Sequence, residues 1–187
     1  MSIKSALLVV AAFLSFPAAA QTFTADSTHT YPTFEVSHFG FSVMRGRFDK
    51  TTGTITLDRS AKKGTADISI DTTSVDTGHA KRDQHLRGPD FFNTEKFPAM
   101  TFKSSDFTFD GDKVSAINGQ LTLLGVTKPV TLQVRSFKCG PHPFTKKEAC
   151  GADAITTIKR SDFGMGYGLP GVGDEIKIAI EIEGLTS

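Results

Sequence analysis

The sequence predicts an all-β protein of eight or nine short antiparallel strands with one helical interruption, arranged as a barrel or a sandwich. Apolar and polar residues alternate with a period of two along most of the chain, and turn residues separate the alternating runs. The length of 187 residues, with 39% hydrophobic and 22% charged, suits one globular domain with its own core. Because such alternation buries one face of each strand, we expect an apolar interior and a polar, solvent-exposed exterior.

The first twenty residues are expected to be a signal peptide that is absent from the folded domain. Lys4 supplies a positive charge, residues 6–16 form an apolar run, and Ala18, Ala19 and Ala20 offer small residues for cleavage before Gln21. The run is shorter than the roughly 20 residues of a membrane span, and no later stretch is apolar enough to be one. We therefore expect an exported, soluble domain at residues 21–187.

The charge balance excludes the class of nucleic-acid-binding proteins. The chain has 21 Lys and Arg residues against 20 Asp and Glu residues, and no basic tract stands out. The aromatic residues are more informative, because the chain has 16 Phe, only 2 Tyr and no Trp. Phe needs no hydrogen-bond partner when buried, so this bias predicts a thick apolar core or an apolar cavity.

The strands are expected where the alternation is regular. The clearest run is the last, in which Ile176, Ile178 and Ile180 alternate with Lys177 and Ala179. Turns are expected at residues 110–112 and 125–129. The expected strand segments are residues 34–38, 53–58, 66–70, 100–102, 107–109, 121–123, 130–134, 152–156 and 176–182.

Residues 78–92 lack the period of two and are expected to contain one short helix over about 79–87, ended by Gly88 and Pro89. His79 and Asp83 lie four residues apart, which predicts a hydrogen-bonded pair on one helix face. The charged residues of this segment are expected to form a solvated, ion-paired face, and so are two charged residues later in the chain. These residues are Lys81, Arg82, Asp83, Arg87 and Asp90 in the segment, and Arg160 and Asp162 beyond it.

Two cysteines are present, Cys139 and Cys150, and in an exported chain they favour a disulfide. Closing this loop would stabilise the fold by about 3 kcal/mol in the chain-entropy model. A redox pair or a metal site is the alternative, but there is no C-x-x-C sequence. His142 and Glu148 are the only metal-type ligands nearby.

We predict no catalytic residue and no metal site. No nucleotide-binding, zinc-protease, serine-hydrolase or haem-attachment motif occurs. Asp26, Ser27 and His29 resemble a triad in composition, but catalytic triads are assembled by the fold and not by adjacency in sequence. The spacing of His79 and His85 does not suit a metal site on one helix face.

An eight-stranded barrel can be filled by its own side chains or can hold a ligand, and alternation alone does not distinguish the two. At this level a ligand cavity and a filled core remain equal alternatives.

The order and spacing of several short motifs resemble the YceI-like family of lipid- and polyisoprenoid-binding proteins, from about Phe23 to Gly184. The matching blocks are DSTHT at 26–30, FEVSHFG at 34–40, GRF at 46–48, GTI at 53–55, TSVDT at 73–77, RDQHLR at 82–87, DFF at 90–92, FP at 97–98, GQLTLLGVTKPV at 119–130 and RSDFG at 160–164.

The resemblance implies an extended lipocalin-like antiparallel β-barrel of about eight strands with a long apolar tunnel. It further implies a periplasmic carrier whose bound partner is a long-chain isoprenoid lipid, such as a polyprenyl lipid or a quinone with its tail, without a catalytic cofactor. A homodimer is a further expectation. Two rival hypotheses are an enzyme that acts on a lipid in the same cavity, starting from His38, His85 or Asp83, and a stress-related interaction module with a filled core.

On this basis we expect inward apolar residues to line the tunnel, and polar residues of the helical segment and of the strand at 34–38 to hold a head group. The expected tunnel residues are Phe34, Val36, Ile55, Leu57, Ile68, Ile70, Leu86, Phe91, Phe92, Phe102, Leu121, Leu123, Ile178 and Ile180. The expected head-group residues are His38, His85 and Arg87.

Overall fold

The computed structural model describes residues 20–186. Residues 1–19 of the expected signal peptide lie outside the described residues. The strands are β1 (Gln21–Ala25), β2 (Tyr31–His38), β3 (Ser42–Phe48), β4 (Thr51–Asp58), β5 (Lys63–Asp71), β6 (Val75–Asp76), β7 (Ala99–Asp110), β8 (Lys113–Leu123), β9 (Val126–Pro141), β10 (Glu148–Lys159) and β11 (Val172–Thr186). The helices are α1 (Ala80–Arg87) and two 3-10 turns, η1 (Thr72–Ser74) and η2 (Arg160–Phe163).

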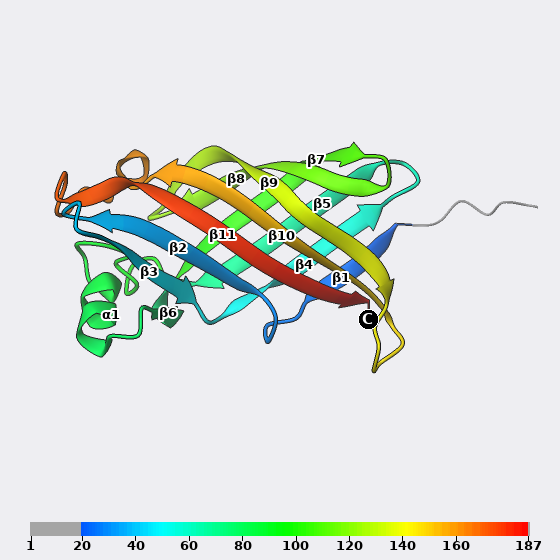
Figure 1. Ribbon diagram of the computed structural model, residues 1–187, viewed down its shortest axis with the longest axis horizontal. Coiled ribbons are helices and arrows are strands. Elements are labelled where there is room, and N and C mark those ends of the chain that lie inside the picture. Colours follow the sequence, from blue (N-terminus) through cyan, green and yellow to red (C-terminus); the bar gives the residue numbers. More distant parts are fainter. Residues whose placement is uncertain (1–19, 187) are drawn as a thin grey trace, which may run out of the picture.

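The strands form a closed antiparallel barrel. Eight of them follow one another in the order β1-β4-β5-β7-β8-β9-β10-β11, and β11 pairs back onto β1 to complete the ring. Figure 1 shows the barrel as an elongated body with α1 at one end and the β9–β10 loop at the other. The predicted fold class, an all-β barrel of about eight strands with one short helix, is therefore confirmed.

The long strand β11 has two neighbours on the same side. Its last residues pair with β1, where Phe23 lies opposite Thr186, and its first residues pair with β2, where His38 lies opposite Val172. The β1–β2 loop spans the point between them, and there the Asp26 backbone N–H donates to the Glu183 carbonyl at 2.8 Å. As a result β2, β3 and β6 extend the sheet beyond β1 at the end that carries α1.

A bulge in β7 explains why its apolar residues change from even to odd positions. The pairing of β7 with β8 shifts in register between Lys103 and Asp106. The Ser104 hydroxyl closes this bulge by donating to the Asn118 carbonyl at 2.6 Å. One extra residue moves the next side chains to the opposite face of a strand. The runs at 100–102 and 107–109 therefore belong to one strand with one inward face.

The turn expected at residues 125–129 is shorter than predicted. Leu124 and Gly125 both have positive φ, 52° and 74°, and form a two-residue turn, so that β9 begins at Val126. Such turns match the twist of the flanking strands. Pro129 therefore lies within β9. It is tolerated because β10 pairs with β9 only as far as Gln133, which leaves the Pro129 edge without a second strand.

Helix α1 forms as expected, but the predicted His79–Asp83 pair does not. His79 caps the helix, and its side chain accepts a hydrogen bond from the Arg82 backbone N–H. Asp83 is buried and instead accepts from the Thr77 backbone N–H at 2.9 Å and from the Thr77 hydroxyl. Arg82 donates to the same threonine. The segment before the helix thus offers Asp83 better donors than a capping histidine can.

Arg160 corrects the expectation of a solvated charged face. Its side chain is 2% exposed, and its guanidinium donates to the carbonyls of Gly173, Met165 and Val172 at 2.8 to 2.9 Å. Burial lowers the pKa of this guanidinium. Asp162 does remain exposed. Arg160 therefore ties η2 and the loop after it to the start of β11.

The residues that resembled a triad form a turn between β1 and β2. One oxygen of the Asp26 carboxylate accepts from Thr28, and the other lies 2.9 Å from His29 Nδ1. The hydrogen bond from His29 is the main cause that lowers the pKa of Asp26 to about 2. The same contact raises the pKa of His29. His29 is exposed and Asp26 half-buried, and their contacts lie within residues 26–29, so this cluster serves local turn geometry.

We predict that Arg160→Met lowers the free energy of unfolding by about 3 kcal/mol, because one buried and two partly buried carbonyls lose a charged donor. Denaturant unfolding of purified protein would measure the change. Arg135→Met is the matched control, since Arg135 is exposed on β9 and should change stability by less than about 0.5 kcal/mol. Equal small effects of both substitutions would contradict a structural role for Arg160.

Candidate functional site: an apolar cavity in the barrel

The barrel encloses a cavity of about 130 Å³ in its middle and at the end away from α1. Every strand of the closed ring contributes to its wall. The lining residues are Phe23, Thr30, Pro32, Thr51, Ile55, Leu57, Ala66, Ile68, Ile70, Phe102, Phe107, Val114, Ile117, Leu121, Val130, Leu132, Val134, Phe137, Cys150, Gly151, Ala152, Ala154, Thr156, Ile178, Ile180, Ile182 and Gly184.

The lining contains no Asp, Glu, Lys, Arg or His, and its only side-chain oxygens are the hydroxyls of Thr30, Thr51 and Thr156. The Thr30 hydroxyl donates to the Glu183 carbonyl at 3.4 Å. The Thr51 hydroxyl is buried and has no hydrogen-bond partner within the described part of the chain. A cavity of this kind suits hydrocarbon and offers nothing that would neutralise a buried charge.

The structure brings eight of the expected tunnel residues to this cavity and leaves six outside its lining. The eight are Ile55, Leu57, Ile68, Ile70, Phe102, Leu121, Ile178 and Ile180. Phe92 and Leu123 are buried in the core beside the cavity, and Phe34, Leu86 and Phe91 pack against that core. Val36 is half-buried on β2 and belongs to neither group.

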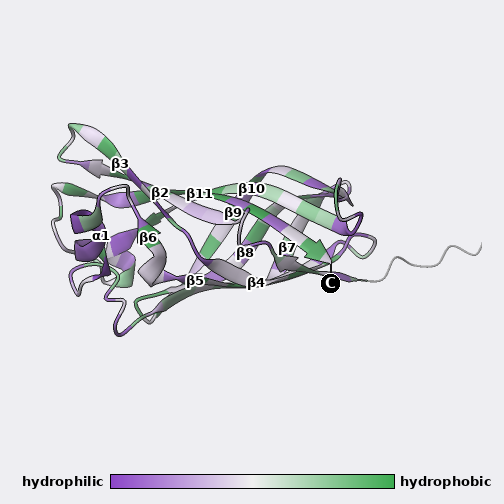
Figure 2. Cartoon of the chain, turned by 90° about the horizontal axis from the view of Figure 1, so that it is seen from below, coloured by the Kyte–Doolittle hydropathy of each residue, from purple (hydrophilic) through white to green (hydrophobic). Residues whose placement is uncertain are grey.

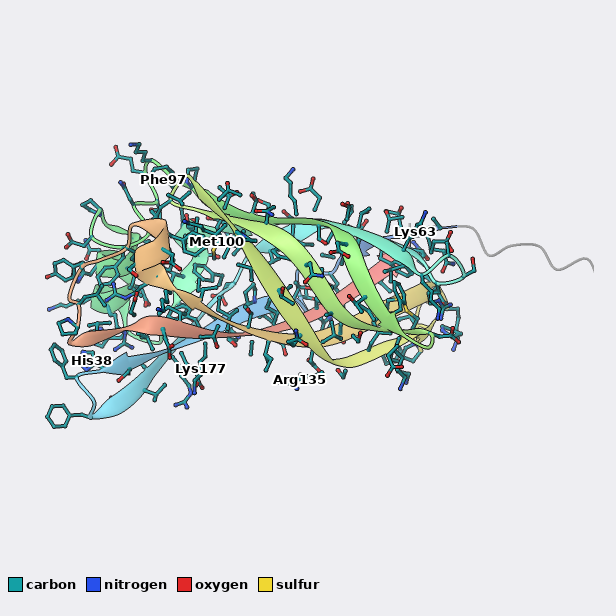
Figure 3. All side chains as sticks on the ribbon, turned by 90° about the horizontal axis from the view of Figure 1, so that it is seen from above. His38, Lys63, Phe97, Met100, Arg135 and Lys177 are labelled. Carbon is teal, nitrogen blue, oxygen red and sulfur yellow. A yellow bond between two sulfur atoms is a disulfide. The ribbon has the colours of Figure 1, made fainter. Side chains whose placement is uncertain are left out.

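Side chains fill the lumen at the α1 end. The rings of Phe48 and Phe92 meet edge to face with their centroids 5.2 Å apart. Phe163 and Met165, which are 2% and 6% exposed, enter the same cluster from η2 and the loop after it. Met100 also belongs to this cluster, and Figure 3 shows its position on the barrel. This plug places Phe92 in packing and not along the cavity wall.

None of the expected head-group residues lies in the cavity lining, and each has another partner. Arg87 donates to the carbonyls of Thr73 and Val75 at 2.7 and 2.9 Å, which fixes α1 to the segment before it. His85 Nε2 lies 2.9 Å from the Asp90 carboxylate. The His38 ring packs against Phe39 at the tip of β2. His85 and Arg87 lie on α1 and His38 ends β2, so the plug lies between these residues and the cavity.

Two glycines keep the cavity open by letting aromatic rings lie flat against the wall. A Cβ atom at Gly64 would lie 2.4 Å from the Phe107 ring, and one at Gly119 would lie 2.3 Å from the Phe102 ring. Neither distance is possible for real atoms, so both rings occupy the space that a side chain would take. Phe102 and Phe107 therefore line the lumen without crossing it.

The end of the cavity away from α1 carries the disulfide. Cys139 and Cys150 are bonded and lie opposite each other on β9 and β10, as predicted. Cys150 lines the cavity and packs against the cluster of Phe23, Leu57 and Val114. The disulfide therefore fixes two wall strands at the point where the barrel ends.

Sequence reasoning missed several lining residues, including Phe107, Val130, Leu132, Val134 and Ile182. All five lie in segments whose alternation was recognised. Their inward direction could have been inferred from the same period of two. Phe23, Phe137 and Cys150 carried weaker signals, because a short strand and a bulge interrupt the pattern around them.

The barrel wall opens outward where β9 and β10 separate. Their pairing ends at Ile155 and Gln133, although both strands continue toward the α1 end. The gap forms an outer hollow of about 570 Å³, and two of its residues, Val130 and Thr156, also line the inner cavity. The hollow and the cavity therefore share one thin stretch of wall.

No helix among the described residues is long and apolar enough to cross a membrane. Within the same residues, no group of three or more His, Cys, Asp or Glu side chains is placed to hold a metal ion.

The fold and the cavity together define a closed antiparallel barrel with an apolar lumen, the architecture that lipocalins use. Comparison with known proteins identifies the family: the YceI-like domain matches residues 23–184, and the chain belongs to the YceI-like family. Protein YceI of Escherichia coli O157:H7 is 40% identical over 161 residues, which cover 86% of this chain and 83% of that protein. Protein YceI of Salmonella arizonae is 38% identical over 161 residues, which again cover 86% of this chain and 83% of that protein.

Solved structures share the fold. BcnA of Burkholderia cenocepacia matches with a TM-score of 0.71 and 25% identity, over 85% of this chain and 98% of BcnA. The YceI protein of Campylobacter jejuni matches with a TM-score of 0.69 and 29% identity, over 81% and 90% of the two chains. A polyisoprenoid-binding domain of Saccharophagus degradans, implicated in plant cell wall breakdown, matches with a TM-score of 0.68 and 17% identity, over 89% and 99%.

We predict that Gly64→Ala narrows the cavity while the barrel still folds. The three atoms nearest to the new methyl group all belong to the Phe107 ring, at 2.4 to 2.8 Å, so the ring must swing into the lumen. Binding of an apolar fluorescent probe should weaken by roughly tenfold, because the probe loses contact area. Gly140→Ala is the matched control, since a Cβ atom there meets nothing within 4 Å. Unchanged probe binding by Gly64→Ala would show that this ring does not set the width of the cavity.

Proposed function

We propose that this protein is a periplasmic carrier that holds a long-chain isoprenoid lipid, either a polyprenyl lipid or a quinone, inside the barrel. The observation that carries the proposal is the cavity inside the barrel, whose lining is apolar and free of ionisable side chains. Membership in the YceI-like family supports it, as does the structural likeness to a domain described as polyisoprenoid-binding. Burial of an apolar chain contributes about 25 cal/mol per Å² of surface removed from water.

The lining favours a ligand whose buried part is neutral. A charged diphosphate inside the cavity would lose its hydration without gaining any cationic partner, which is strongly unfavourable. A quinone carbonyl or an alcohol needs only a hydrogen bond, and the unpartnered Thr51 hydroxyl is the lining group best able to provide one. We therefore favour a quinone or a prenyl alcohol over a prenyl diphosphate held entirely within the lumen.

The cavity is also smaller than the roughly 300–1,000 Å³ of typical ligand pockets. A long chain would fit only if side chains that narrow the lumen move aside. Phe92, Phe163 and Met165 are the most suitable, because they reach the plug from η2 and from loops and not from the closed ring of strands. Displacing this plug would extend the cavity toward the α1 end without breaking the strand pairing of the ring.

An enzyme that acts on a lipid in the same cavity is less well supported. Such an enzyme needs an acid, base or nucleophile that faces the lumen. Asp83 is held by Thr77 and His85 by Asp90, while His38 packs on Phe39 at the tip of β2. These were the three suggested starting points, and none of them reaches the cavity lining.

Solvent extraction of the purified exported protein, followed by mass spectrometry, tests the carrier proposal. We expect a neutral isoprenoid lipid at close to one molecule per barrel. The Gly64→Ala protein should carry clearly less of it than the Gly140→Ala control. Recovery of no lipid from protein that also fails to bind added quinone or prenyl alcohol would favour the filled-core module instead.

The proposed location rests on the signal-peptide pattern, and β1 begins at Gln21, the first residue after the expected cleavage site. We predict that protein from the periplasmic fraction has an intact mass that corresponds to residues 21–187 with both cysteines oxidised. A mass that retains Met1, or thiols that react with iodoacetamide before reduction, would contradict this prediction.

A further inference from the structure

Large apolar side chains are exposed mainly at one end of the molecule. Within residues 20–186, seven large hydrophobic residues have substantial exposure, and five of them lie on the β2–β3 turn, on β3 just after it, and on the loop before β11. These five are Phe39, Phe41, Val43, Tyr167 and Leu169, with exposed fractions of 59%, 93%, 46%, 51% and 37%. We call this group the apolar tip. Figure 2 shows hydrophobic colouring at the turn that leads into β3.

The two loops of the apolar tip are joined to each other. The Phe39 backbone N–H donates to the Gly171 carbonyl at 2.7 Å, and the Phe39 ring lies where a Cβ atom of Gly171 would be. Tyr167 is held from behind by edge-to-face contacts with His85 and Phe91. The exposed rings are therefore presented by an organised surface.

The two segments that form the tip contain no charged residues, although charged residues are common in the rest of the chain. Residues 39–44 and 163–173 contain no Lys, Arg, Asp or Glu, whereas such residues make up 22% of the chain. Arg45 and Asp174 come directly after these two segments. Entry of these two segments into an apolar phase would thus remove none of their own side chains from water in an ionised form.

We propose that the apolar tip inserts into the interface of a lipid bilayer. The tip is a projecting pair of loops, and none of its five side chains lines the cavity or the outer hollow between β9 and β10. Aromatic side chains are favoured where an apolar phase meets water. The absence of charge fits a bilayer better than a protein partner, whose interface normally has a polar rim with hydrogen bonds.

The loop before β11 would connect this docking to the lumen, a step that rests on the proposed carrier function. Phe163 at the end of η2 and Met165 of this loop are buried in the plug, while Tyr167 and Leu169 of the loop are exposed at the tip. Docking of the tip would therefore place the plugged end of the barrel against the bilayer, where a lipid could enter or leave.

The absence of tryptophan from the chain allows a direct test. Phe41→Trp places a single reporter at the tip. Phe144→Trp places the matched reporter in the β9–β10 loop at the other end, where Phe144 is 87% exposed. On addition of phosphatidylcholine vesicles, we expect a blue shift of emission for Phe41→Trp and none for Phe144→Trp. Adding phosphatidylglycerol to the vesicles should not be required, because the tip carries no charge.

Vesicle sedimentation of tryptophan-free variants complements the reporters. Phe41→Ser should lower the partition coefficient by roughly tenfold or more, whereas Phe144→Ser should change it less than twofold. Both phenylalanines are almost fully exposed, so neither change should affect folding.

Several results would overturn the inference: no shift with any vesicle, equal shifts at both ends, or binding only to vesicles that contain phosphatidylglycerol. A Phe41→Trp shift without vesicles that grows with protein concentration would show that a second copy of the chain covers the tip. If the protein does not bind vesicles but lipid is recovered from it by solvent extraction, the tip proposal is rejected and the carrier proposal is retained.

Discussion

Closure of the sheet through β11 is the constraint on which the rest of the structure depends. This strand of 15 residues pairs with β10 along one side and, on the other, with β2 and then β1. Its contact with β1 turns an open sheet into a ring with no free edge at that end. Because inward residues alternate along every strand of the ring, closure creates the apolar lumen at the same time. The cavity is therefore a consequence of strand pairing.

Different interactions stabilise the two ends of the barrel. At one end the Cys139–Cys150 disulfide and the cluster around Phe23 and Leu57 hold the strands together. At the other end, loops and 3-10 turns supply the plug, and the buried Arg160 fixes them to the barrel through three backbone carbonyls. Contacts made by loops are easier to rearrange than a ladder of strands. The plugged end is thus the one where a lipid could be exchanged without opening the ring.

The sequence was most informative where a local rule decides the structure. Alternation at Ile178 and Ile180 predicted both the strand and its inward face, and the cysteine count in an expected exported chain predicted the disulfide. Backbone groups brought close only by the fold could not be predicted in this way. Nothing in the sequence around Arg87 and Arg160 distinguishes them from solvated arginines. Each nevertheless donates to carbonyls from other segments. The head-group role expected for Arg87 stays a prediction, although its donors already bond the carbonyls of Thr73 and Val75.

The same limit explains why the apolar tip was not recognised from the sequence. Phe39 and Phe41 directly follow the alternating residues Phe34, Val36 and His38 but fall on the opposite parity, and the sequence alone does not show that a turn carries them beyond the core. Their exposure becomes visible only when Gly171 and the loop before β11 are placed beside them. The buried Phe163 and the exposed Tyr167 then lie four residues apart in one loop, on opposite sides of the barrel's end. A bilayer that attracts the tip would act on the same backbone that holds the plug. Under the proposed docking, membrane contact would be linked to access of the lumen by short-range packing, without any signal passing through the wall of strands.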